Sequence, residues 1–486
     1  MMKQITIGRE SRLGCVVLFV GLAVFSFRFL AAGPEWLLSG AGVALLGLGA
    51  FLSVLLLLSL VWQRPRAPGL MRSHLRPVLA IWWSLLVSEE IFSRNTPEPQ
   101  SFAGRFSEAA YAEAVFWMVA FSASLVLARP QHLRQAFSAG NRWLTLFAVV
   151  CLASAPFSPT PLYSLAWAFK LVLVVLLLVL TSTAMHTDRD VESFLWSNLW
   201  GFALLSLVAL VRALANPTGA FEDGRLYGSP NGLSITTGVL VLLALTLYTV
   251  RRRRWLVGFA VFGATVMIMS GGKAGIAAGI VSVMAFFVLQ RRFAASFGWL
   301  WAMIAIAGLV LATTPLASHF TTYQQEGHLS NISGRTDLWQ AVWPEILQRP
   351  FVGHGYLASR FVSEAVAGAF SEAGHLHNGF IDTVYNTGLA GLTVLIMMHG
   401  VILRNLWRSL RNSPGGNERV LVVGCCALYV NLFINGEFNS TFGGAARPPF
   451  MMLLGLLAVT EKLRVMSRPS FVPMPTSCAS PPAGKP

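Results

Sequence analysis

Residues Gly374–Leu392, GHLHNGFIDTVYNTGLAGL, place two imidazoles and a carboxamide directly before an apolar run that continues through Met398. A neutral imidazole is the usual general base near pH 7, so His375 and His377 are candidates for proton abstraction. Side chains two residues apart face apart in a helix and share a side only in an extended strand. We therefore expect one histidine to act on a substrate and the other to support the loop. As a metal site the pair is weak, because no third ligand follows at a usual spacing.

Three cations occur in polar segments between apolar runs. Arg225 lies in the glycine-rich FEDGRLYGSPNGLS, Lys273 in SGGKAG, and Arg335 in NISGRTDLW near the start of a predicted helix. An arginine in a loop more often solvates that loop than binds a ligand, whereas a lysine closely flanked by apolar runs is costly and either functional or snorkelling. Arginine forks bind phosphate oxygens in bidentate fashion, and lysine acts as a point charge. Together with the histidines, these cations suggest an anionic ligand and a proton acceptor.

The remaining acidic groups are weaker candidates. Asp188 and Asp190 form the D-x-D pattern by which many sugar transferases hold a metal, but their loop is predicted to be cytoplasmic, away from the other candidates. Glu89 and Glu90 end an apolar run on the outer side and keep an acid-based or metal-assisted site open as an alternative. No nucleotide-binding glycine motif is present, so the energy for a reaction would come with its substrate. A lipid-linked pyrophosphate donor fits this requirement.

The elements that position these groups follow from composition. The chain has 486 residues, of which 55% are hydrophobic and only 12% charged, and its mean hydropathy is +0.62. Soluble domains carry about 25% charged residues. Apolar runs long enough to cross ~30 Å of hydrocarbon recur along the chain, and backbone groups in lipid must be paired within a helix. The sequence therefore predicts an all-α integral membrane protein. The five cysteines fall mostly in apolar segments, without metal or disulfide spacing.

The predicted fold has about 12 to 14 transmembrane helices, both counts giving the same sidedness for the loops. The net charge of +15 comes mainly from arginines in short loops, which is the arrangement of cytoplasmic loops and not of a nucleic-acid-binding protein. The N-terminal apolar run is interpreted as an uncleaved first helix. The predicted spans lie near residues 14–31, 36–62, 78–93, 110–128, 143–157, 163–184, 194–215, 231–250, 255–270, 274–290, 298–317, 386–403, 420–435 and 449–461.

The chain divides into four parts on this basis. Residues 1–317 are transmembrane helices with short loops, and 318–385 form one large periplasmic, mainly helical loop that carries the histidines. Ser333 is expected to cap a helix that ends before Pro350, and a second short helix is expected around residues 357–367. Residues 386–465 hold the last transmembrane helices. Residues 466–486 are rich in Pro and Ser and are predicted to be a disordered cytoplasmic tail.

Several stretches of the sequence resemble the bacterial O-antigen ligase/polymerase superfamily. SGRTDLW, RPFVGHGY and HNGFIDTVYNTGLAGL are similar to its hallmark segment, and GRLYGSPNGLS is similar to its upstream arginine-containing turn. The resemblance runs from about Arg225 to Leu392. It implies a membrane glycosyltransferase of the bacterial inner membrane that uses undecaprenyl-pyrophosphate-linked glycans at the periplasmic face. Such enzymes work without a metal or other cofactor and invert the anomeric carbon.

The same resemblance implies roles for individual residues. His377 becomes the general base, Arg225 and Arg335 bind the donor diphosphate, and Asn378 orients the ring or caps a helix starting at Gly379. The superfamily often has Ser-Arg where this chain has Gly272-Lys273, so the charge is kept but the fork is lost. His375 is expected to play a supporting role.

The expected reaction is that of an O-antigen ligase, with lipid A-core as acceptor, membrane lipids as surroundings and no nucleic acid as partner. The short sequence after the hallmark favours a ligase over an O-linked oligosaccharyltransferase, and an O-antigen polymerase is the nearest alternative. Outside the superfamily, the rival is a transporter of a lipid-linked sugar. Lys170, which lies inside an apolar run, is the main feature that favours transport.

Overall fold

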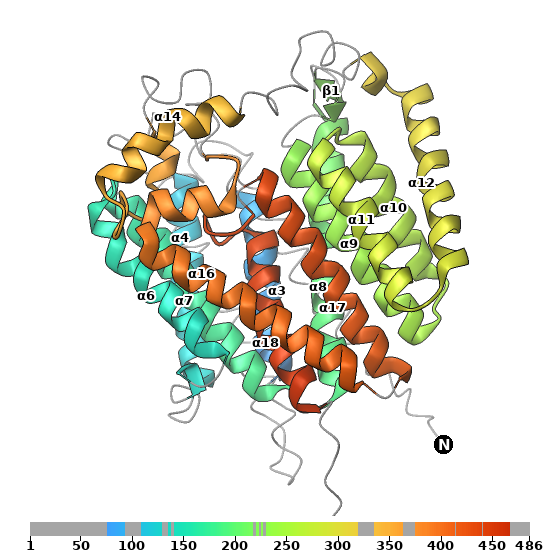
Figure 1. The fold of residues 1–486 in the computed structure, drawn as a ribbon, viewed down its shortest axis with the longest axis horizontal. Helices are drawn as coiled ribbons and strands as arrows, with labels where there is room; N and C mark the ends of the chain where they lie inside the picture. The colour runs from blue at the N-terminus through green and yellow to red at the C-terminus, as the bar shows by residue number, and fades with distance from the viewer. Residues whose placement is uncertain are drawn as a thin grey trace, which may run out of the picture.

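The computed structural model describes residues 75–92, 108–128, 135–137, 140–216, 220–222, 225–226, 230–318, 335–362, 375–413, 415–439 and 441–466. These residues form a bundle of helices with one two-residue hairpin (Figure 1). The predicted spans 14–31 and 36–62, the cap at Ser333 and the C-terminal tail lie outside the described residues. Every other predicted span coincides with a helix, and the all-α membrane fold is confirmed.

The helices of the first part follow one another with short connections. They are α3 (Leu75–Phe92), α4 (Glu108–Leu127), α6 (Asn141–Ser154), α7 (Pro161–Ala184), α8 (Asp188–Leu214), α9 (Pro230–Arg251), α10 (Trp255–Met269), α11 (Lys273–Leu289) and α12 (Phe293–Thr313). A 3₁₀ turn, η5 (Ala155–Phe157), extends α6. The hairpin of β1 (Phe221–Glu222) and β2 (Arg225–Leu226) joins α8 to α9 and pairs antiparallel, with Glu222 opposite Arg225.

The second part consists of α14 (Arg335–Gln348), the 3₁₀ turn η6 (Ala358–Phe361), α16 (Gly379–Asn412), α17 (Gly416–Phe438) and α18 (Pro448–Met466). The helix predicted before Pro350 is therefore present as α14. The short helix expected around 357–367 appears as the tighter η6, and the residues from 363 to 374 lie outside the described part. Both α14 and the hairpin lie at the same end of the bundle, which we call the α14 end (Figure 1).

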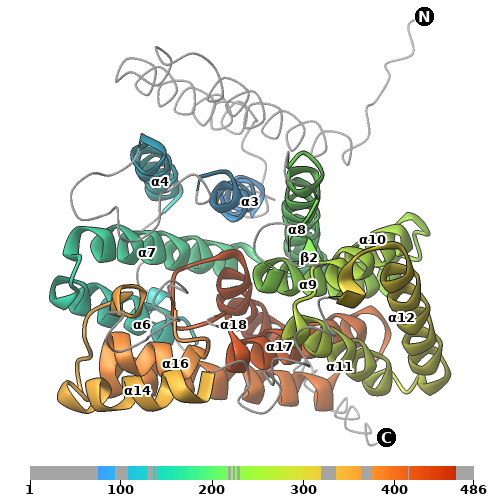
Figure 2. The same cartoon turned by 90° about the horizontal axis from the view of Figure 1, so that it is seen from above.

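Six described helices are long and apolar enough to cross a membrane: α7, α8, α9, α12, α16 and α17. The innermost helix is α18, in which all side chains of residues 448–460 are buried and which packs on α16, α17 and α7. The least enclosed is α12, at one edge of the molecule, where only Ser296, Met303 and Val310 are buried (Figure 2). Because α12 is apolar all round, its outward side chains suit a lipid surrounding.

Candidate active site

The site is built on a sharp corner within α16. Gly388 has φ 64° and ψ −165°, a conformation open almost only to glycine, and α16 is kinked there. A Cβ at this position would lie 2.3 Å from the carbonyl carbon of Phe351. The loop of residues 350–356 closes on the corner through backbone bonds from Leu389 to Pro350 (2.7 Å) and from His354 to Tyr385 (2.8 Å). Two of the stretches singled out in the sequence, RPFVGHGY and YNTGLAGL, are thus one structural unit.

The helix start at Gly379 is confirmed, with Asn378 as its cap. The Asn378 side-chain oxygen accepts from the backbone N–H groups of Phe380 (2.9 Å) and Ile381 (3.1 Å), which would otherwise lack helical partners. Its amide group donates to the backbone carbonyl of Glu437 (3.0 Å) and to a Glu437 carboxylate oxygen (3.3 Å). The end of α17 therefore fixes the orientation of Asn378, and with it the place where the histidine loop joins the helix.

Leu376, between the two histidines, is anchored from both sides. Its N–H donates to an Asp382 carboxylate oxygen (3.1 Å), and its carbonyl accepts from the Trp339 indole N–H (2.8 Å). The Leu376 side chain is buried in an apolar cluster with Leu338 and Val342 of α14. These contacts dock α14 against the histidine loop and bring its first residue, Arg335, to the histidines.

The histidine loop is strained. His377 has φ 55°, a left-handed conformation that costs on the order of 1–3 kcal/mol for a residue other than glycine. The His377 N–H donates to Nδ1 of His375 (3.3 Å), and the ring centroids are 4.2 Å apart at 77°. The two imidazoles are therefore in contact, although side chains two residues apart in a helix would face apart. The difference arises because the helix begins only at Gly379, after both histidines.

Both imidazoles are held neutral by their surroundings. Burial lowers the pKa of His377 to about 4, assisted by the positive charge of Arg335. The pKa of His375 is lowered well below its ordinary value by burial, then by His377 and by the guanidinium groups of Arg447, Arg360 and Arg335. Nδ1 of His377 is buried and has no hydrogen-bond partner among the described residues. Unsatisfied buried nitrogens are rare and costly, and in a native protein each one calls for an explanation.

Two of these arginines were missed in the sequence. Arg360, in η6, donates to the Tyr163 hydroxyl, and its guanidinium carbon lies 5.9 Å from the tyrosine ring centroid. Arg447 directly precedes α18, in a segment tied to the 350–356 loop by the bond from the Tyr356 hydroxyl to the Gly444 carbonyl (2.9 Å). A signal was available: both arginines fall in segments predicted to be periplasmic, whereas the positive-inside rule predicts basic residues mainly in cytoplasmic loops.

Arg225 and Lys273 occupy a second region of the α14 end. Arg225 begins β2, and the adjacent Leu226 packs with Leu233 and Val266 of α9 and α10. Lys273 is the first residue of α11, after a turn with Gly271 at φ 67°. No described contact joins either residue to the histidines. Because α17 packs against both α11 and α16, it lies between the two groups.

The remaining sequence candidates have structural roles or lie elsewhere. Asp190 accepts from the backbone of His186 and Thr187 and caps α8, at the end of the bundle opposite α14. Glu89 and Glu90 lie in the last turns of α3. Lys170 is fully buried, with its ammonium 4.5 Å from the Trp167 ring centroid and 4.9 Å from that of Trp117. Within the described part of the chain, no group of three or more metal-capable side chains gathers.

Part of the chain is similar to a known protein family. A search of curated proteins found no match to the chain. Residues 258–396 match the family model described as O-antigen ligase. The matched stretch runs from α10 through the Gly388 corner and includes Lys273, Arg335, both histidines and Asn378, whereas Arg225 and Arg447 lie outside it. The chain is thus a multi-pass membrane protein in which residues 258–396 are similar to the O-antigen ligase family.

Proposed function

We propose that the protein is an O-antigen ligase, which transfers a glycan from undecaprenyl pyrophosphate to lipid A-core at the periplasmic face of the bacterial inner membrane. The observation that carries the proposal is a neutral imidazole pair beside the positive charges of Arg335, Arg360 and Arg447. Uncharged bases next to several cations suit a reaction that removes a proton from a hydroxyl while negative charge develops on a leaving phosphate.

In this reaction His377 accepts the proton of the acceptor hydroxyl as the hydroxyl oxygen forms a bond to the anomeric carbon of the donor. The bond between that carbon and the phosphate oxygen breaks, and its electron pair leaves with undecaprenyl pyrophosphate. The attack comes from the face opposite the leaving group, so the anomeric configuration inverts. Arg335 stabilises the charge that grows on the departing phosphate, an electrostatic effect that is usually the largest single contribution to catalysis.

The division of labour between the histidines follows from their bonds. Nδ1 of His375 already accepts the backbone N–H of His377, so that nitrogen supports the strained loop. Nδ1 of His377 makes no hydrogen bond to the described residues, so no such bond ties this ring to the loop. Asn378 and Leu376 are held by Glu437, Asp382 and Trp339, which fixes the loop on either side of His377. These contacts support His377 as the base and His375 as a positioning residue.

The bound donor would itself improve the base. The low pKa of His377 arises partly from Arg335, so the imidazole is a weak proton acceptor in the free protein. A pyrophosphate placed against Arg335 offsets that positive charge and raises the basicity of His377. Arg225 and Lys273 extend the anion-binding region on the far side of α17, toward the apolar pocket of Ile276, Met303 and Leu316 between α11 and α12.

Alternative functions differ in product. A polymerase of this superfamily would join one lipid-linked glycan to another, and an O-linked oligosaccharyltransferase would use a protein hydroxyl. A transporter would form no covalent product. The burial of Lys170 against two indoles gives that residue a structural explanation, since a cation over aromatic faces is stabilised without a transported ligand. This weakens the main sequence argument for transport.

The decisive experiment incubates the purified full-length protein with undecaprenyl-pyrophosphate-linked glycan and lipid A-core, without nucleotide and with EDTA present. A glycosylated lipid A-core is expected. Longer lipid-linked glycan in its place would indicate a polymerase, and glycosylation only of an added protein acceptor an oligosaccharyltransferase. Loss of product on chelation, restored by Mg²⁺ or Mn²⁺, would contradict the metal-free mechanism and direct attention to Glu89 and Glu90.

The sidedness of the site is tested separately. Single cysteines are placed at Gln340 in α14 and at Arg252 after α9, and intact spheroplasts are treated with a membrane-impermeant thiol reagent. Labelling at 340 and protection at 252 are expected. The reverse pattern would place the histidine loop in the cytoplasm and overturn the proposed reaction, because the donor glycan is presented at the periplasmic face.

A further inference from the structure

At the end of the bundle opposite α14, α8 and α10 form a ladder of aromatic rings. Trp196 and Trp200 of α8 alternate with Trp255 and Phe259 of α10. Ring centroids are 5.5 Å apart for Trp196 and Trp255, 5.9 Å for Trp200 and Trp255, and 5.4 Å for Trp200 and Phe259. We call these four residues the aromatic ladder. Its outer face is open, since Trp200 and Trp255 are 37% and 42% exposed.

The position of the aromatic ladder along the chain is the one expected at the boundary between membrane and water. Trp255 is the first residue of α10 and directly follows the arginine run Arg251–Arg254. Indole rings favour this boundary, because one side of the ring system is apolar and the N–H can meet polar headgroups. The exposed rings and the arginines are therefore stacked in the order in which a lipid presents acyl chains and headgroup.

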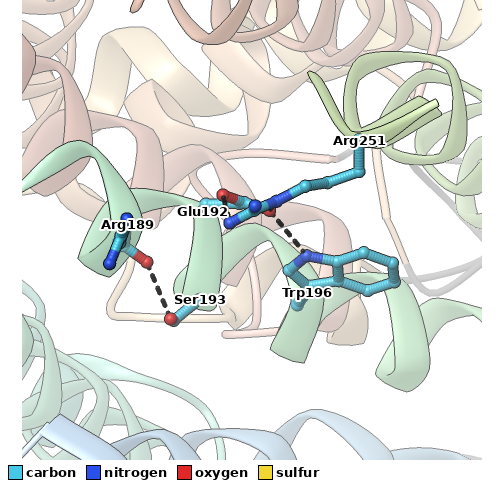
Figure 3. Close-up of polar contacts among 5 residues, drawn as sticks. All are labelled: Arg189, Glu192, Ser193, Trp196 and Arg251. Atoms are coloured by element: carbon cyan, nitrogen blue, oxygen red, sulfur yellow. Dashed lines mark hydrogen bonds and ion pairs between the residues drawn. The ribbon is translucent and has the colours of Figure 1, made fainter. Parts of the chain in front are cut away.

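The first arginine of the run, Arg251, has a structural role. Arg251 lies over the Glu192 carboxylate, forming an ion pair through Nε and a hydrogen bond from a terminal nitrogen at 2.7 Å (Figure 3). The same carboxylate accepts from the Trp196 indole N–H (3.1 Å). Nearby, the Ser193 hydroxyl donates to the Arg189 carbonyl (2.7 Å). Glu192 thus balances the charge of Arg251 and fixes the first ring of the aromatic ladder.

The next three arginines follow in an exposed turn. Arg252, Arg253 and Arg254 are exposed, and the left-handed backbone of Arg252 (φ 55°) forms the turn between α9 and α10. On the neighbouring helix α8, the Asp190 carboxylate accepts hydrogen bonds from the backbone of His186 and Thr187 at the start of its own helix. The exposed side chains of Arg252 and Arg254 give the turn beside the aromatic ladder its positive charge.

We propose that this surface binds an anionic phospholipid, with the headgroup phosphate against Arg252 and Arg254 and an acyl chain along Trp200 and Trp255. Basic residues at a membrane surface attract anionic lipids with about 1 kcal/mol each, a factor of about five in affinity. Stacked aromatic rings with an open outer face provide a rigid apolar strip for the chain. The site does not depend on the proposed transferase reaction, and its ligand is a lipid of the surrounding leaflet.

The test measures lipid selectivity of the full chain purified in detergent. Native mass spectrometry counts retained phosphatidylglycerol and phosphatidylcholine with identical acyl chains, at low salt and at high salt. Preference for phosphatidylglycerol is expected, and it should weaken at high salt because the contact is electrostatic. Equal retention of the two lipids by the wild-type protein overturns the proposal without the need for any variant.

Matched variants locate the site. Arg252→Gln combined with Arg254→Gln should lower phosphatidylglycerol retention on the order of 25-fold, a factor of about five for each charge. Arg291→Gln with Arg292→Gln removes the same charge from the similar turn between α11 and α12 and should have little effect. Equal losses in both double variants would mean general attraction to a basic protein, and would overturn a specific site.

The chain contact is tested by quenching. Phosphatidylglycerol brominated in its acyl chain should quench part of the tryptophan fluorescence, and Trp255→Leu should remove more of that quenching than Trp301→Leu. Trp301 is the fair control because it is 68% exposed and lies on α12, away from the aromatic ladder. Equal changes for the two variants would refute the proposed position of the chain.

Discussion

Arginines gather at both ends of this bundle, but their surroundings differ between the two ends. At the α14 end, Arg335, Arg360 and Arg447 surround two imidazoles that carry no charge. At the opposite end, Arg251 is balanced by the buried Glu192 carboxylate, and the arginines after it point outward from a turn. The first arrangement gathers several guanidinium groups around uncharged imidazoles inside the protein, where the proposed anionic donor would bind. The second places balanced or solvated charge at a membrane surface.

The backbone differs in the same way. The opposite end uses ordinary helix caps, such as the reciprocal bonds between Thr187 and Asp190. The α14 end holds His377 in a left-handed conformation and Gly388 at a corner that tolerates no Cβ. Strain of this kind persists only where surrounding bonds determine it, as those to Leu376 and Asn378 do here. Guanidinium groups gathered around neutral imidazoles on a strained backbone distinguish this candidate active site from a basic surface.

The largest expected difference between the two ends concerns histidine. General-base assistance contributes about 10²–10⁴-fold in rate, so His377→Ala should reduce ligation by that factor while donor binding persists. His186, an exposed histidine at the opposite end, provides the control, and His186→Ala should leave the rate unchanged. His375→Ala should have the milder effect, because its ring supports the loop. Near-normal turnover of His377→Ala would refute its role as the base.

Arginines should show a smaller difference of the same kind. A hydrogen bond to a charged group contributes roughly 1.5–3 kcal/mol, so Arg335→Ala should lower kcat/KM about 10- to 150-fold. Arg335→Lys should recover only part, since lysine lacks the planar fork. Arg349, exposed at the end of α14, is the matched control, and Arg349→Ala should be nearly silent. Full recovery by lysine would mean that Arg335 supplies charge without recognising phosphate.

The depressed pKa of His377 predicts the pH dependence. A base with a pKa of about 4 is deprotonated across the physiological range, so kcat/KM should fall only as the pH approaches 4. Removing the nearby charge in Arg335→Gln should move this acid limb upward toward 6.5, the ordinary histidine value. An acid limb already near 6.5 in the wild-type protein would show that the imidazole is not held neutral.

The stability of the folded protein should also depend on the protonation of His377. Because the pKa of His377 is lower in the folded state, the unfolded chain binds the proton first as the pH falls. The contribution of this group is full above pH 6.5 and is lost progressively between about 6.5 and 4. Thermal unfolding of the detergent-solubilised protein should show this decline, and His377→Ala should reduce it. An unchanged pH profile in the variant would contradict the assigned shift.

The sequence was informative about helices and less so about the site. Hydropathy located the described apolar helices α3 to α12 and α16 to α18, because a membrane span depends on a long apolar run and little else. Residue types and spacing also indicated α14 before Pro350 and the cap at Asn378, whose role depends on the next three residues. The kink at Gly388 was not foreseen, since it is accompanied by contacts with the distant 350–356 loop. Arg360 and Arg447 were missed for the same reason: they approach the histidines through tertiary packing.

The smallest effect is expected at the opposite end, in Glu192→Gln. The substitution keeps an acceptor for the Trp196 indole but removes the negative charge under Arg251. The Glu192 side chain is 7% exposed and that of Arg251 46%, so solvent screens the pair from one side. Exposed ion pairs contribute about 0–1 kcal/mol, and the loss of unfolding free energy should stay within roughly that range. Ligation should be unaffected, because no candidate catalytic residue lies at this end.

A loss of several kcal/mol in the unfolding free energy of Glu192→Gln would show that the pair behaves as a buried ion pair whose removal leaves a desolvated charge. A loss of ligation with stability intact would be more serious, since it would couple the two ends and contradict the assignment of the candidate active site to the α14 end alone.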